Sequence, residues 1–104
     1  MELIRNMKHE TVLPLADLVS VQEGQIISKT LAQNAAVSIT LFAFAKGEEI
    51  GTHDSTGDAM VQVLEGTGQF TINGTAFECH AGDALVMPAK KPHAVYATEN
   101  LKWY

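Results

Sequence analysis

Short apolar segments recur along the chain, and turn-forming residues separate them. Residues 25–31 alternate between polar and apolar positions and include the β-branched Ile26 and Thr30. The Asn73-Gly74 pair lies between two such segments and is typical of a type I′ hairpin turn, because both central positions of that turn take positive φ. The pattern predicts strands at 25–31, 36–45, 59–64, 69–72, 75–79, 84–87, 93–98 and 101–104. Strands at this spacing indicate an all-β, antiparallel sandwich or barrel.

Helix has little place in this pattern, since Pro14 leaves residues 13–19 room for one turn at most. Residues 41–45 are apolar at every position, whereas a strand with one face in water should alternate. Either the N-terminal arm, residues 1–24, or another subunit must cover the second face. We therefore predict a homodimer whose interface covers part of residues 41–45 and of the arm.

Composition narrows the class of protein. The 104 residues, 46% hydrophobic and 18% charged, predict a single folded domain over residues 1–104. The formal net charge of −5 argues against nucleic acid as a partner, because phosphate binding needs clustered Lys and Arg. No apolar run approaches the length of about 20 residues that a helix needs to cross a bilayer. Residues 1–6 also lack the basic and then apolar order of a signal peptide. We therefore expect a cytoplasmic protein with no membrane partner. The lone Cys79 excludes an internal disulfide framework and a cysteine-based zinc site.

Glycines, histidines and a proline in the second half follow two spaced patterns. In the first, five residues separate Gly47 from His53, and the pattern closes at Gly66. In the second, five residues separate Gly82 from Pro88, and His93 follows. These patterns, over residues 47–97, resemble the two motifs of the cupin superfamily. The resemblance implies a small antiparallel β-barrel of jelly-roll type, often a homodimer, with the two histidines pointing into the barrel.

The same comparison shows where this chain departs from the family pattern. Ser55 stands at the position of a second histidine, and Ala59 stands at the position of a glutamate. Of the four metal ligands that the resemblance implies, this chain keeps His53 and His93. Two imidazoles underfill a site for a divalent transition metal such as Zn, Fe, Mn or Ni, because catalytic sites usually supply three protein ligands. Asp58 could substitute only if a bend turned it inward.

These residues lead to two main hypotheses of function. The first is a small-molecule-binding cupin of unassigned ligand with weak or no metal binding. Its pocket would be formed by His53, Ser55, Ala59, Val61 and His93. The alternative is a metal-dependent enzyme of dioxygenase, isomerase or decarboxylase type that uses a reduced His53/His93 site. An accessory subunit with residues 41–45 at its interface is a third interpretation, and catalytic residues are not assigned.

Overall fold

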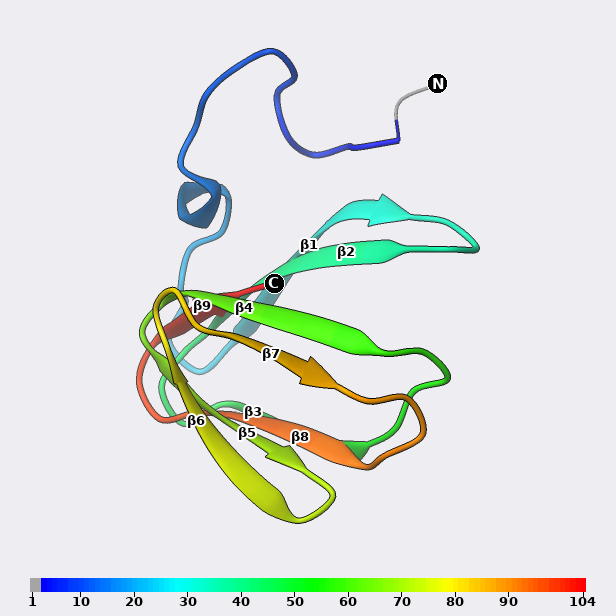
Figure 1. Ribbon diagram of the computed structural model, residues 1–104. Helices are drawn as coiled ribbons and strands as arrows, with labels where there is room; N and C mark the ends of the chain where they lie inside the picture. The colour runs from blue at the N-terminus through cyan, green and yellow to red at the C-terminus, as the bar shows by residue number, and fades with distance from the viewer. Residues whose placement is uncertain (1–2) are drawn as a thin grey trace.

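The computed structural model describes residues 3–104, and strands are nearly all of their regular secondary structure (Figure 1). The one helical element is a 3-10 turn, and no helix in this part of the chain is long and apolar enough to cross a membrane. The elements in chain order are η1 (Leu15–Leu18), β1 (Ile26–Gln33), β2 (Ser38–Phe44), β3 (Glu49–His53), β4 (Ala59–Glu65), β5 (Thr67–Ile72), β6 (Thr75–His80), β7 (Ala84–Met87), β8 (His93–Ala97) and β9 (Leu101–Trp103).

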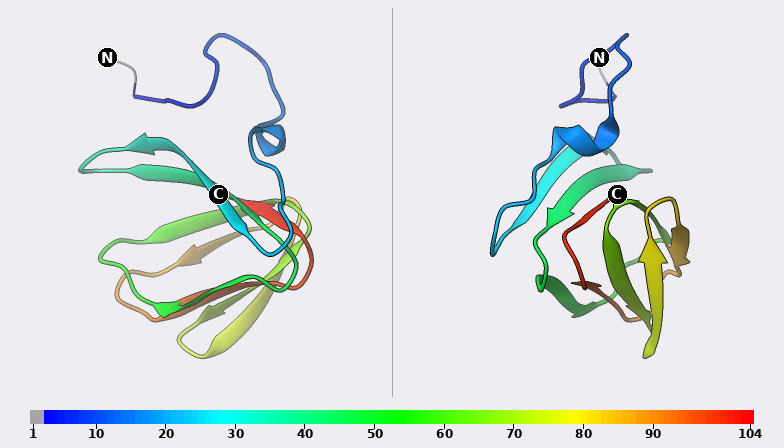
Figure 2. Two further views of the ribbon diagram at one scale, coloured as in Figure 1. Left: turned by 180° about the vertical axis from the view of Figure 1, so that it is seen from behind. Right: turned by 90° about the vertical axis from the view of Figure 1, so that its left-hand side faces the viewer.

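Two antiparallel sheets form the body of the protein (Figure 2). One sheet has the strand order β1-β2-β9-β4-β7, and the other has the order β3-β8-β5-β6. Buried side chains from both sheets meet in one cluster, with Phe44 and Trp103 from the first and Phe70 and Val95 from the second. The prediction of an all-β, antiparallel jelly-roll fold is confirmed.

Eight of the nine strands lie within two residues of the predicted bounds. The Asn73-Gly74 turn is also confirmed, since φ is 48° at Asn73 and 85° at Gly74. Strand β3 was not predicted. It contains Gly51, pairs with β8 alone at the edge of its sheet, and is exposed at all but one position. An edge strand with so little buried surface lacks the apolar alternation by which a strand is recognised.

The N-terminal arm covers the second face of β2. Leu41 and Ala43 are fully buried in a cluster with Val19 of the arm. The Lys102 ammonium donates a hydrogen bond to the carbonyl oxygen of Ala16, which ties the arm to β9. The chain itself therefore supplies the cover, and the predicted use of residues 41–45 as a subunit interface is wrong at Leu41 and Ala43, which have no surface left to share.

Removing the buried contact of the arm should destabilise the whole protein. Val19→Ala deletes two carbons from a side chain that is 4% exposed, so we expect the free energy of unfolding to fall by about 1.5–3 kcal/mol. Val12→Ala is the matched control, because Val12 lies in the same arm but is fully exposed. It should change stability by less than about 0.5 kcal/mol. Urea unfolding measures both variants, and equal effects would show that the arm does not pack on β2 in solution.

Candidate functional site

The pairing of β3 with β8 brings two histidines together. His53 and His93 are directly opposite each other in the strand register. Their ring centroids are 4.2 Å apart, with the planes inclined at 71°. His93 is buried and His53 is exposed, so the pair runs from the interior to the surface. The sequence patterns predicted that both histidines point into the barrel. The two rings are indeed in contact, but only His93 is buried.

Backbone carbonyl groups hold both imidazole rings. Nδ1 of His53 lies 3.0 Å from the carbonyl oxygen of Gly51, and Nδ1 of His93 lies 3.2 Å from that of Lys91. A carbonyl oxygen can only accept a hydrogen bond, so Nδ1 donates in each case. In a neutral imidazole this places the lone pair on Nε2. Both rings are thus held in the tautomer that can accept a hydrogen bond or bind a metal through Nε2.

A cavity of about 670 Å³ lies beside the histidine pair. All five residues of the predicted pocket line it: His53, Ser55, Ala59, Val61 and His93. The alternation of β4 explains two of them, since Ala59 and Val61 are two residues apart and share the inward face of the strand. Most of the remaining wall is apolar, with contributions from Phe42, Ile50, Met87, Val95 and Trp103.

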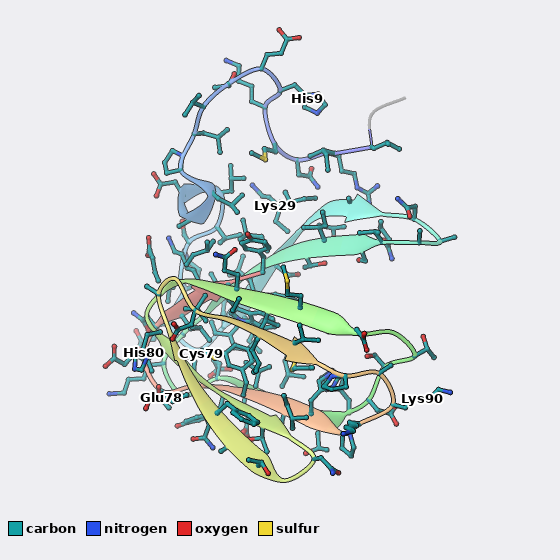
Figure 3. All side chains as sticks on the ribbon, in the orientation of Figure 1. His9, Lys29, Glu78, Cys79, His80 and Lys90 are labelled. Atoms are coloured by element: carbon teal, nitrogen blue, oxygen red, sulfur yellow. The ribbon has the colours of Figure 1, made fainter. Side chains whose placement is uncertain are left out.

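Two loops close one end of the barrel beside this cavity. The backbone N–H of Ala89 donates to Oδ1 of Asp58, and the backbone N–H of Lys90 donates to the carbonyl oxygen of Ser55. The Ser55 hydroxyl donates to the carbonyl oxygen of Gly57. Figure 3 shows Lys90 at this end. Residues 55–58 and 88–90 are therefore fastened to each other next to the histidines.

The side chains at the cavity do not make a complete metal site. His53 and His93 could supply two Nε2 ligands, but Ser55 and Ala59 supply neither an imidazole nor a carboxylate. Asp58 does line the cavity, although one of its oxygens is engaged by Ala89. Across residues 3–104, no three His, Cys, Asp or Glu side chains come together in a group that could hold a metal. These residues do not fit the three-ligand site of a typical metalloenzyme.

Cys79 and His80 lie at the end of the molecule opposite Lys90 (Figure 3), and neither lines the cavity. Cys79 is buried, and burial together with the nearby Asp83 carboxylate raises the pKa of its thiol. The thiol therefore stays protonated and unreactive. His80 is exposed and lies 3.6 Å from carboxylate oxygens of both Glu78 and Asp83. Neither residue is part of the candidate site at the cavity.

Most other residues that line the cavity were not identified as site residues from the sequence, among them Ile50, Phe42 and Trp103. Ile50 belongs to β3, the strand that was not predicted. Phe42 and Trp103 stack in parallel with ring centroids 4.5 Å apart, and an apolar segment gives no signal of which aromatic side chains will border an open space. Trp103 Nε1 is the one buried side-chain nitrogen or oxygen within residues 3–104 that has no hydrogen-bond partner.

Comparison with known proteins identifies the family. A family model described as "Cupin domain" matches residues 40–104. A conserved protein of unknown function from Streptococcus pyogenes is 42% identical over 99% of this chain and 90% of its own, with a TM-score of 0.96. A cupin superfamily protein from Desulfitobacterium hafniense is 34% identical over 96% of this chain and 92% of its own, with a TM-score of 0.92.

A more distant match is a variant of the salicylate 1,2-dioxygenase from Pseudoaminobacter salicylatoxidans. It is 26% identical over 64% of this chain and 19% of its own, with a TM-score of 0.61. Curated proteins give no match. The family-model match over residues 40–104 and the 34% identity to a cupin superfamily protein over nearly the full length together show that this chain belongs to the cupin superfamily.

Proposed function

We propose that this cupin binds a small organic molecule in the cavity at the His53–His93 pair. The observation that carries the proposal is the cavity itself, which has apolar walls and a few polar groups at one end. Its volume of about 670 Å³ falls within the range of about 300–1,000 Å³ typical of small-molecule sites. His53, Ser55 and His93 would orient the ligand, while Ala59 and Val61 would contact its apolar part.

Metal binding by this pocket should be weak. Losing a residue that only hydrogen-bonds to a metal ligand commonly costs about 10–100-fold in metal affinity, and this chain lacks two of the ligands themselves that the family pattern implies. A metal-dependent enzyme of dioxygenase, isomerase or decarboxylase type is the second candidate. It is favoured by the two Nε2 lone pairs on adjacent rings and by the likeness to a dioxygenase. A ligand that itself supplied oxygen atoms would be needed to complete such a site.

Filling the cavity should abolish binding of small molecules. We expect hits from a fragment library to shift the amide NMR signals of His53, Val61 and His93, and Ala59→Phe to weaken these hits by at least about 10-fold, because the new ring would occupy their space. Ala76→Phe is the matched control, since Ala76 is exposed on β6 and does not line the cavity. Hits that bind both variants as tightly as wild type would contradict the proposal.

Restoring the missing ligands should create a metal site. Purified without added metal, the wild type should carry well under one divalent metal per chain, whereas Ser55→His with Ala59→Glu should approach one, because both positions line the cavity. Added metal should then raise the thermal stability of the double variant and leave that of wild type nearly unchanged. Ser55→Asn with Ala59→Gln is the control, and elemental analysis is the measurement. Stoichiometric metal in the wild type would make the metalloenzyme the leading candidate.

We also propose that the protein forms a homodimer through a surface other than the covered face of β2. Met60 and Val86 are opposite each other on β4 and β7, and they are 64% and 50% exposed. Light scattering at micromolar concentration should give the mass of two chains, and Met60→Glu with Val86→Glu should give that of one. Val12→Glu is the control substitution, because Val12 is also exposed but lies in the N-terminal arm. A wild type with the mass of a single chain would overturn the dimer.

A further inference from the structure

The polar end of the cavity is rich in hydrogen-bond acceptors. Because Nδ1 of both His53 and His93 donates to a carbonyl oxygen, each neutral ring has only the Nε2 lone pair left to offer. The Ser55 hydroxyl donates its proton to the carbonyl oxygen of Gly57, so toward the cavity Oγ of Ser55 can only accept a hydrogen bond. Asp58 adds a carboxylate, which accepts in its ionised form. All four side chains therefore present lone pairs.

Nε2 of His93 is open to the cavity. The side chain as a whole is only 4% exposed. Within residues 3–104, Trp103 Nε1 is the one side-chain nitrogen or oxygen that is both buried and without a hydrogen-bond partner. The His93 ring forms its hydrogen bond through Nδ1, which leaves Nε2 without a partner. Since Nε2 is not among the buried unpartnered atoms, it must retain some accessible surface. Since His93 lines the cavity, a bound molecule can reach this lone pair.

Two backbone donors in the loop beside the histidines are already engaged. The backbone N–H groups of Ala89 and Lys90 donate to Asp58 and Ser55. The Tyr104 hydroxyl donates to the Gln62 side chain. Other hydroxyl groups at the cavity are those of Ser38 and Thr40, which belong to β2 in the opposite sheet. An anion placed at the histidines would face lone pairs and the negative charge of Asp58. Burying that anion without hydrogen-bond donors would cost free energy.

Apolar side chains line most of the rest of the cavity, and they come from both sheets. Its walls include Phe42 and Trp103 on one sheet and Ile50 and Val95 on the other. Val37 and Met60, both exposed, line it at the surface. A bound molecule can therefore place a polar headgroup at the histidines and an apolar body along these walls.

We propose that the headgroup of the ligand is a hydrogen-bond donor, a hydroxyl or amino group on an apolar body, and that carboxylates and phosphates are rejected when no metal is bound to the histidines. The proposal deepens the function proposed above and rests on the same cavity. Such a pocket would select ligands that carry a proton to donate. A ligand hydroxyl can donate to Nε2 of His93 or His53, whereas a carboxylate has no proton to donate.

Three probes of similar size test the headgroup: 4-propylphenol, the 4-propylbenzoate anion and propylbenzene. In chelator-treated wild-type protein, NMR titration should give a dissociation constant for the phenol at least about 10-fold below those of the other two, the effect of one buried hydrogen bond. Equal affinities for all three at the cavity would overturn the headgroup proposal and leave the small-molecule function standing. No shift of cavity residues by any probe at millimolar concentration would overturn both.

Two variants with matched controls locate the effect. His93→Phe should weaken the phenol by about 10-fold and leave propylbenzene unchanged, whereas His80→Phe, at the other end of the barrel, should change neither. Asp58→Asn keeps an oxygen for Ala89 but removes the charge, so it should tighten the benzoate by several-fold. Asp54→Asn removes the same charge outside the cavity and should not. A benzoate that binds wild type as tightly as the phenol, or a phenol unaffected by His93→Phe, would overturn the proposal.

Discussion

The pairing of β9 between β2 and β4 holds the five-stranded sheet together, and the rest of the structure depends on it. This strand has only three residues, yet Trp103 is opposite both Phe42 and Val63. Its entry requires a close approach, because a Cβ at Gly66 would lie 1.8 Å from the carbonyl oxygen of Asn100. Gly66 also has φ of 83°, a conformation that side chains disfavour. Only glycine permits the chain to return at this point.

The same sheet explains why one strand is apolar on both faces. Phe42 and Phe44 point toward the core between the sheets, while Leu41 and Ala43 point toward the arm. The strand is therefore buried on both sides within one chain, which is the condition that removes the polar half of the alternation. The arm is thus a structural layer of the protein, and it closes the side of the sheet opposite the site.

The site combines rigid walls with a few fixed polar groups. The histidines are opposite each other on paired strands, and backbone carbonyl groups orient both rings. Trp103 contacts the rings of Phe42, Phe44 and Phe70. Aromatic contacts of this kind contribute about 0.5–1.5 kcal/mol each, enough to offset the about 1–3 kcal/mol cost of its unpartnered Nε1. Under the proposed function, a pocket held in this way would select a ligand by the position of its proton donors without first rearranging.

The alternating strands, the Asn73-Gly74 turn, the two spaced patterns and the inward side of β4 that carries Ala59 and Val61 could all be predicted from the amino-acid sequence. These features depend on neighbouring residues and on a period of two, so they can be read along the chain. That β3 forms, that the arm covers Leu41 and that Met60 is exposed could be learned only from the three-dimensional arrangement. The same holds for the place of Asp58 at the cavity and for the contact of each histidine Nδ1 with a backbone carbonyl group. Except for the Nδ1 contacts, each of these depends on contacts between segments far apart in the chain, and a local pattern cannot specify which segment will meet it.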